Sequence, residues 1–381
     1  MMGTTVTASA NQELDQVLEL LCEALQLSPT EREDADQKYT SVGNWLSADG
    51  SRLQVLQPKI RYQGSILLGT VTKPWQREEF DVDLMCILQA TIHQYPNPAV
   101  VYDLVANRMA EHAVYRELME PKDRCIQLNY SGQFHLDIVP ALPQYLGSMS
   151  LFIPDRSKGA WVGTKPFEYA WWFKSRTALS AAQRELYEKK ARADIAPLPP
   201  PVKAADISPL QRTVQLLKRR RDVYFRGDDD APKSIALTTL AGNHYRGEQL
   251  CTDALIGMLG RLKGQLEATR GILVVPNPVD PTENLGRHWN MSSYRKFVRF
   301  IDTFLQEMTQ LLTTRGWDAI QELLEELFGD RARVAVEKYA KRLEEKRRGG
   351  GLGFSRGPAV ISALPSVASQ RKVPPNEFFG S

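Results

Sequence analysis

The sequence YQGSILLGTVTKPWQREEFDVDLMCIL, residues 62–88, contains the two motifs that decide the fold. It opens on a Gly-Ser dipeptide, Gly64-Ser65, and closes on the pair Asp81 and Asp83. The two aspartates alternate with apolar residues in FDVDLMCIL, a composition typical of a largely buried strand. Both carboxylates therefore point to one face of the predicted strand, about 6.5–7 Å apart along it.

Two like charges on a half-buried strand are unfavourable unless a cation balances them. Exposed aspartates that protect an edge strand from aggregation are the alternative interpretation. The upstream Gly64-Ser65 favours a metal site, because Asp-x-Asp alone is a weak signal. The sequence holds two further pairs in polar surroundings, expected to be solvated: Asp34/Asp36 and Asp228/Asp230.

A Gly-Ser turn lets backbone N–H groups and a hydroxyl approach phosphate oxygens with no side chain in the way. Mg²⁺ favours a few carboxylates together with substrate phosphates. The arrangement resembles the polymerase-beta-like nucleotidyltransferases, whose signature is Gly-Ser, a spacer and Asp-x-Asp on the next strand. The spacer here, residues 66–80, is somewhat long, and its polar part, residues 70–79, is expected to be a connecting loop.

The resemblance implies a third carboxylate on a neighbouring strand, and Asp137 within FHLDIVPAL is the candidate. Residues 125–129 and 133–139 flank Tyr130-Ser131-Gly132, which is typical of a hairpin. A lone aspartate in a strand is more often a hydrogen-bonded structural residue. Its place after the other two motifs makes Asp137 the expected third metal ligand.

Composition describes an ordinary globular protein of 381 residues, 43% apolar and 24% charged, long enough for two or three lobes. A net charge of +3 is small for an electrostatic nucleic-acid binder, so no long nucleic acid is expected as a partner. No apolar run suits a membrane span, and no signal-peptide core is present. The four cysteines are scattered, which suggests neither disulfides nor zinc and favours a cytoplasmic location.

The resemblance implies an α/β (α+β) fold, with a mixed-sheet nucleotidyltransferase core, a helical second lobe of oligoadenylate-synthase type and the active site in the interlobe cleft. We expect residues 1–10 to be disordered and 11–200 to form the core lobe, including a helix from residue 11 that serves as a spine behind both lobes. A proline-rich linker, residues 196–201, would lead to the helical lobe at 201–348. Residues 349–381 are expected to be a flexible tail.

A capping box at residues 208–211 predicts a helix that carries Lys218-Arg219-Arg220-Arg221. We expect most of this basic run to be a solvated helical face. Lys218 follows an apolar pair and is expected to point into the interlobe cleft, where its ammonium would neutralise a triphosphate. Ser234 opens the next predicted helix, where a serine is either a plain cap or a phosphate contact.

The strings LQRTVQLLKRRRD (210–222) and KSIALTTLAGNHY (233–245) resemble the bacterial cyclic-oligonucleotide synthases called cGAS/DncV-like nucleotidyltransferases. In that family a lysine and a serine at these places clamp the triphosphate, which implies this role for Lys218 and Ser234. Residues 274–289 are similar to the D-P-T-x-N segment of oligoadenylate synthases and receive no chemical role. The zinc-binding insertion of the animal DNA sensor is absent, so activation by long double-stranded DNA through it is not expected.

The resemblance implies an enzyme that joins nucleoside triphosphates, ATP and GTP among them, into a cyclic di- or trinucleotide for a downstream effector in antiphage defence. Asp81 and Asp83 would hold one Mg²⁺, and Asp137 with that pair a second, with Mn²⁺ able to substitute. The triphosphate would be oriented by Gly64, Ser65, Lys218 and Ser234.

Three alternatives stay open from the sequence alone: an antibiotic adenylyltransferase, an RNA-tailing enzyme and a catalytically dead nucleotide-binding scaffold. The low net charge opposes the tailing enzyme, and the complete aspartate set opposes the dead scaffold. The tryptophan-rich residues 159–173 are expected to pack between the lobes rather than stack on bases. The C-terminus, Phe378-Phe379-Gly380-Ser381, suggests a possible conjugation partner of ubiquitin-like transferase type.

Overall fold

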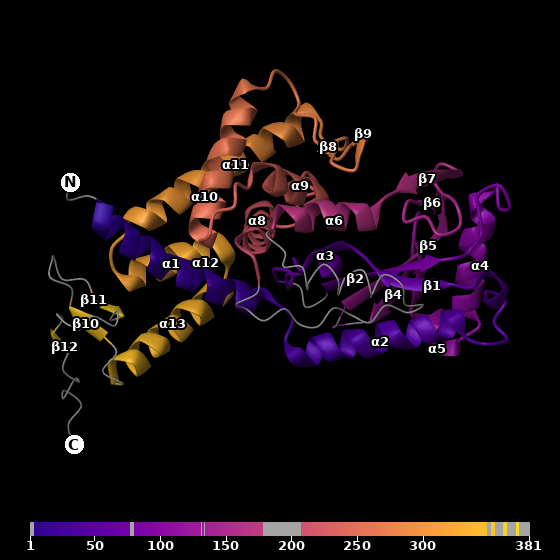
Figure 1. Cartoon of the computed structure of the whole chain (residues 1–381), viewed down its shortest axis with the longest axis horizontal. Coiled ribbons are helices and arrows are strands. Elements are labelled where there is room, and N and C mark those ends of the chain that lie inside the picture. Colours follow the sequence, from indigo (N-terminus) through magenta and orange to yellow (C-terminus); the bar gives the residue numbers. More distant parts are fainter. Residues whose placement is uncertain are drawn as a thin grey trace.

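The structure is a computed structural model, and it describes residues 4–76, 80–130, 132, 134–177, 207–348, 352–354, 361–363 and 371–372. Figure 1 shows an elongated molecule with a lobe built on a β-sheet at one end and a lobe of helices at the other. The helix α8 (Pro209–Phe225) lies where the lobe of helices meets the lobe built on the sheet.

The core lobe contains a sheet of seven described strands whose main path runs β1-β2-β5-β4-β3. At its centre β2 (Phe80–Ile87) pairs parallel with β5 (Phe134–Pro143), while every other pair in this sheet is antiparallel. The mixed sheet expected from the sequence is confirmed. The remaining strands are β1 (Lys59–Tyr62), β3 (Met119–Pro121), β4 (Ile126–Tyr130), β6 (Leu151–Asp155) and β7 (Ala160–Thr164).

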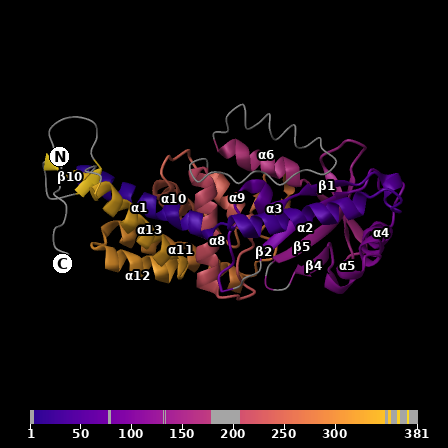
Figure 2. The ribbon, with the colours of Figure 1, turned by 90° about the horizontal axis from the view of Figure 1, so that it is seen from below.

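Helices on one face of the sheet bury the alternate residues Val82, Leu84 and Cys86 of β2. These helices are α2 (Pro29–Ser47), α4 (Pro98–Ala110) and α5 (Ala113–Leu118), and Figure 2 shows α2 running along the sheet. The hydrophobic cluster on the other face is smaller. It contains Met85 and Ile87 and packs next to α6 (Pro166–Arg176). Since alternate residues of a strand point to the same face, Asp81 and Asp83 lie on the same, less covered face as Met85 and Ile87.

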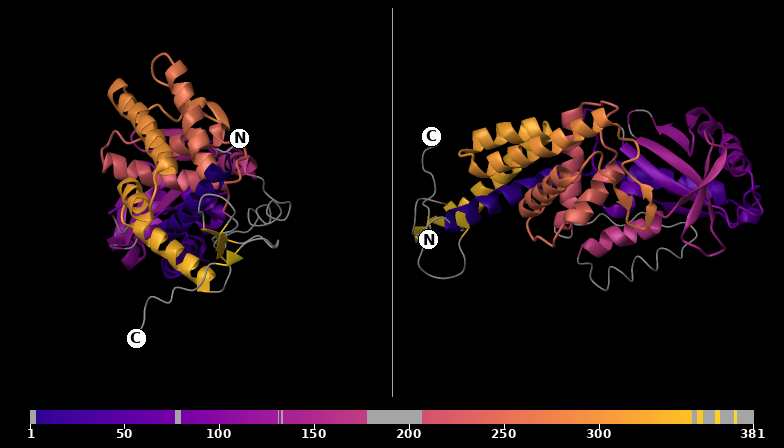
Figure 3. Two further views of the ribbon diagram at one scale, coloured as in Figure 1. Left: turned by 90° about the vertical axis from the view of Figure 1, so that its left-hand side faces the viewer. Right: turned by 90° about the horizontal axis from the view of Figure 1, so that it is seen from above.

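The helical lobe expected from the sequence is confirmed, and α1 (Thr4–Leu25) belongs to its core. Figure 3 shows α1, in indigo, beside the yellow and orange helices, and α1 contacts α8, α10 and α13. The capping box of Ser28 and Glu31 then begins α2, which packs on the sheet of the other lobe. The remaining helices are α9 (Ser234–His244), α10 (Cys251–Ala268), α11 (Met291–Thr313), α12 (Trp317–Phe328) and α13 (Arg331–Arg348).

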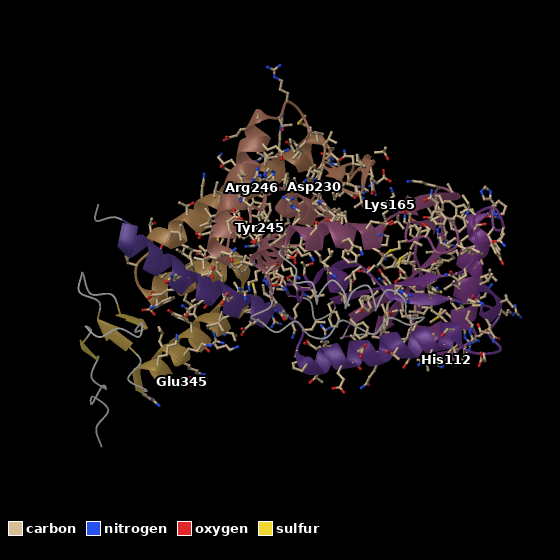
Figure 4. All side chains as sticks on the ribbon, viewed as in Figure 1. His112, Lys165, Asp230, Tyr245, Arg246 and Glu345 are labelled. Carbon is tan, nitrogen blue, oxygen red and sulfur yellow. The ribbon has the colours of Figure 1, made fainter. Side chains whose placement is uncertain are left out.

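Several contacts join the lobes on the α6 side. The indole of Trp172 in α6 packs against the core of the helical lobe, as expected for packing between the lobes. Trp161 does not follow this expectation, since it packs against the core of the sheet lobe and donates to the carbonyl oxygen of Tyr95 at 3.1 Å. Residues 276–284 form a hairpin of β8 (Pro276–Asn277) and β9 (Asp280–Asn284). Lys165, at the start of α6, donates to the carbonyl oxygen of Val279 at 3.1 Å, and Figure 4 shows it on the side facing this hairpin.

Regular secondary structure occurs near both ends of the described chain. Helix α1 includes residues 4–10, and no glycine or proline interrupts residues 4–25. The tail holds a three-stranded antiparallel sheet of β10 (Leu352–Phe354), β11 (Ile361–Ala363) and β12 (Arg371–Lys372). Short segments such as these pair through main-chain hydrogen bonds, which a composition poor in core residues does not prevent.

Other expectations fall outside the described residues: the linker at 196–201, with the lobe boundary placed there, and the C-terminal Phe378–Ser381. In the part of the chain that the structure describes, no helix has the length and apolar character to cross a membrane.

Candidate active site

The sheet brings the three predicted aspartates together. Asp83 of β2 and Asp137 of β5 are register partners in the parallel pair, and Asp81 precedes Asp83 on the same face. Asp81 is exposed, and Asp83 and Asp137 are half-buried. The carboxylates therefore form one acidic group at the open face of the sheet.

The predicted Gly-Ser turn lies directly against this acidic group. Gly64 and Ser65 begin the short helix α3 (Gly64–Leu68), and the backbone N–H of Gln63 donates to the carbonyl oxygen of Asp83 at 3.0 Å. Gly64 has a φ of +60°, and a Cβ atom at this position would lie 2.1 Å from Oδ2 of Asp83. Only glycine meets both conditions, so the turn and the aspartate strand form one unit.

The pKa of Asp83 is raised by its burial and by the neighbouring carboxylates. Burial, and then the neighbouring Asp137 and Asp81, raise the pKa of Asp83 to about 7, against a smaller opposing effect of Lys218. The side-chain amide of Gln127 donates to Oδ1 of Asp137 at 2.9 Å. The thiol of Cys125 is also hydrogen-bonded to Asp137, and burial followed by the charge of Asp137 raises its pKa to about 12.

Lys218 on α8 extends toward the acidic group from the helical lobe. It is buried, and its Nζ donates to the carbonyl oxygen of Thr70 at 3.0 Å. Burial, and then the nearby Arg221, lower the pKa of Lys218 to about 8, while Asp83 and Asp81 act in the opposite direction. The predicted orientation of this lysine, toward the cleft, therefore agrees with its surroundings.

Ser234, the first residue of α9, is bound by Arg221 of α8, which was expected to belong to a solvated helical face. Nη1 of Arg221 donates to the hydroxyl of Ser234 at 2.7 Å. The same guanidinium binds Oδ1 of Asp222 through Nε at 2.8 Å and Nη2 at 2.6 Å. The sequence does indicate that Arg221 faces the cleft with Lys218. Lys218, Arg221, Asp222 and Phe225 recur at the i, i+3, i+4, i+7 spacing of one helical face.

The expectation of a solvated basic face on α8 is wrong. Arg219 is only 1% exposed, and Arg220 is buried and binds both carboxylate oxygens of Glu307, at 3.0 and 2.7 Å. The reason is tertiary: α8 is surrounded by α1, α9, α10, α11 and α12, so it has no fully solvated side.

All seven residues predicted for the site line one cleft of about 960 Å³ between the sheet and helices α8 and α9. The cleft is also lined by polar and aromatic residues that were not predicted from the sequence. Among them are Trp75, Gln76, His135, Arg221, Asp222, Arg226 and Asp229.

The donor set suits a hard divalent cation. Carboxylate oxygens are the ligands that Mg²⁺ prefers, and a cation would relieve the repulsion that raises the pKa of Asp83. In the described part of the chain, no three histidine, cysteine or acidic side chains are gathered closely enough to enclose a metal by themselves.

Comparison with known proteins places the chain in a family. The model of the Second Messenger Oligonucleotide or Dinucleotide Synthetase domain matches residues 13–176. A c-di-GMP synthase from Roseivirga ehrenbergii is 31% identical, over 98% of this chain and 99% of the relative. The cyclic dinucleotide synthase CdnG from Bradyrhizobium diazoefficiens is 26% identical, over 93% of this chain and 92% of the relative.

Solved structures give the same result. The structure of B. diazoefficiens CdnG in complex with GTP matches 87% of this chain and 99% of its own, with a TM-score of 0.68 and 25% identity. Vibrio cholerae DncV, at 12% identity and a TM-score of 0.52, shares the fold over 87% of this chain and 92% of its own. With a full-length relative above 30% identity, the chain belongs to the cGAS/DncV-like nucleotidyltransferases.

Proposed function

We propose that this nucleotidyltransferase joins nucleoside triphosphates into a cyclic di- or trinucleotide and releases pyrophosphate, with GTP as a principal substrate and ATP as a further one. The observation that carries the proposal is the contact of Gly64 with Asp83 inside the cleft that Lys218 and Ser234 also line. The choice of GTP is supported by the c-di-GMP synthase relative and by the GTP complex of CdnG.

Asp81, Asp83 and Asp137 would hold two divalent cations, Mg²⁺ with Mn²⁺ as a substitute. When bound, such a pair neutralises charge on the entering and leaving oxygens of a phosphoryl displacement. The aspartates are suited to this role because β2 and β5 place Asp83 beside Asp137 in register, with Asp81 two residues before Asp83. Gln127 and Cys125 also hold Asp137 in place.

The substrate triphosphate would be held from both lobes. Gly64 and Ser65 line the cleft at the start of α3. Gly64 has no side chain to obstruct a phosphate, and the Ser65 hydroxyl and the first N–H groups of α3 would donate hydrogen bonds to its oxygens. From the opposite side, the Lys218 ammonium would neutralise the triphosphate and the Ser234 hydroxyl would bind a phosphate oxygen. Positioning and charge neutralisation of this kind supply most of the catalysis in nucleotide transfer.

The product would act as a second messenger for a downstream effector in bacterial antiphage defence, with the enzyme in the cytoplasm. Family membership supports this role. A conjugation partner at Phe378–Ser381 is a separate proposal: deletion of residues 376–381 should abolish any conjugate while leaving synthesis intact. A conjugate that persists on the truncated chain would contradict it.

The test is incubation of the purified protein with all four labelled nucleoside triphosphates and Mg²⁺ or Mn²⁺, followed by phosphatase and nuclease P1. We expect a phosphatase-resistant product that contains guanine. Nuclease P1 then separates 3′-5′ from 2′-5′ linkages, since it cleaves the former. Linear products, or products that require added RNA or an antibiotic, would instead indicate a tailing enzyme or an adenylyltransferase.

A further inference from the structure

The loop between α8 and α9 is fastened to the helical lobe on both sides of one residue. Asp228 and Asp230 both bind Nζ of Lys296 on α11, at 2.7 and 2.6 Å. The N–H of Asp230 also donates to Oδ1 of Asp228 at 2.9 Å. Figure 4 shows Asp230 in the helical lobe near α11. The loop therefore presents its middle residue, Asp229, from a fixed base.

Asp229 is exposed and lines the cleft of the proposed active site. Among the described residues, no hydrogen bond or ion pair engages its carboxylate. Besides the predicted metal ligands, two other aspartates line the cleft, and both are engaged in ion pairs. Arg221 binds Asp222, and Lys296 binds Asp228. Asp229 is thus the carboxylate in the cleft that is positioned for a ligand yet not engaged by the protein.

An apolar surface lies in the same part of the cleft. Ile235 follows Ser234 at the start of α9, lines the cleft and is 38% exposed. Thr238 lines the cleft one turn further along the helix. If Ser234 binds the phosphate end of a nucleotide, Ile235 offers an apolar contact for the flat face of a base, and the Asp229 loop is available to its edge.

We propose that Asp229 is a specificity-determining residue that accepts hydrogen bonds from N1–H and N2–H of a guanine base. This inference rests on the proposed function and names the base that the site selects. An ionised carboxylate only accepts hydrogen bonds, and guanine presents two adjacent donors on its Watson–Crick edge. Adenine and cytosine present a ring-nitrogen acceptor there, and uracil a single donor between two carbonyl oxygens, so each would set a lone pair against the carboxylate.

The test compares kcat/KM for GTP and for ATP, measured by pyrophosphate release, in the wild type and in Asp229→Asn. We expect the variant to lose about 10- to 100-fold with GTP and no more than about twofold with ATP. Xanthosine triphosphate should become a better substrate of the variant, because xanthine has a carbonyl in place of the 2-amino group and an amide can donate to it. Asp103→Asn, the same charge change at an exposed residue of α4 that does not line the cleft, should keep the wild-type preference.

An unchanged GTP preference in Asp229→Asn, or an equal loss with every nucleotide, would overturn the assignment. Pyrophosphate release reports base preference whatever the form of the product. Linear products from the wild type would therefore contradict the proposed function while leaving the test of Asp229 intact.

Discussion

Gly64 and Asp83 are so close that a single added carbon would not fit: a Cβ on Gly64 would lie 2.1 Å from Oδ2 of Asp83. We predict that Gly64→Ala reduces turnover at least 100-fold, because Asp83 must move away from its position beside Asp137. The unfavourable φ of +60° should also reduce the free energy of unfolding by about 1–2 kcal/mol. Steady-state kinetics and urea unfolding measure the two effects.

Gly50→Ala is the matched control, since Gly50 has a φ of +77° and no atom within 4 Å of an added Cβ. It should show the same loss of stability with normal turnover. Equal turnover in the two variants would show that the contact with Asp83 is unimportant.

Asp83 should make the metal-free protein less stable as pH rises. Its pKa is about 7 in the folded state and near the ordinary 3.8 when unfolded, so the folded state binds the proton more tightly. The resulting stabilisation is complete below about pH 4 and is lost as pH rises through 7, up to about 4 kcal/mol. Urea unfolding in EDTA at several pH values should therefore show a downward slope that Asp83→Asn reduces.

Magnesium should reverse this loss, because a ligating carboxylate must be deprotonated. The increase in melting temperature on adding Mg²⁺ should be larger at pH 8 than at pH 6, and absent in Asp81→Asn/Asp83→Asn. Identical pH slopes in the wild type and Asp83→Asn, together with a pH-independent Mg²⁺ effect, would contradict the role of Asp83.

The main elements of the site could be predicted from the sequence because each is a local pattern. Gly64-Ser65, the alternation around Asp81 and Asp83, and the hairpin that carries Asp137 are all encoded within a few residues. Strand pairing then fixes their relative positions, since Asp83 and Asp137 must lie on the same face if β2 and β5 are neighbours.

Contacts made by distant segments could not be predicted in this way. Helical periodicity shows which residues share a face of α8, but the burial of Arg219 depends on helices from both ends of the chain. Likewise, the three consecutive aspartates 228–230 look alike in the sequence, and only Lys296 distinguishes the two that it binds from Asp229.

Arg219 should contribute little to stability despite its burial. Its Nε and Nη1 have no hydrogen-bond partner in the described part of the chain, and burial, followed by Arg331, lowers its pKa to about 10. We predict that Arg219→Met leaves the free energy of unfolding unchanged or raises it by about 1–3 kcal/mol. Arg220→Met should lower it by about 1–3 kcal/mol, because Glu307 loses both of its hydrogen bonds.

Urea unfolding of the two variants at neutral pH measures this difference. A larger loss of stability in Arg219→Met than in Arg220→Met would show that the Arg219 guanidinium has a stabilising partner.

The contact of Trp172 with Gly242 should limit how α9 packs against the core lobe. A Cβ on Gly242 would lie 2.6 Å from Cη2 of Trp172. We predict that Gly242→Ala lowers the free energy of unfolding by about 1–3 kcal/mol through overpacking, although alanine favours a helix. In α10, Gly264→Ala has no atom within 4 Å of the added carbon and should stabilise by about 0.5–1 kcal/mol. Thermal unfolding distinguishes the two, and a gain of stability in both would contradict the close packing.

Metal-dependent synthesis of a cyclic nucleotide is tested by comparing the labelled products that the wild type and Asp81→Asn/Asp83→Asn make from GTP and Mg²⁺. Both proteins are first shown to be folded by circular dichroism. We expect a phosphatase-resistant product with the mass of a cyclic guanine oligonucleotide from the wild type and none from the variant. The same product from the variant, or only linear products from the wild type, would contradict this expectation.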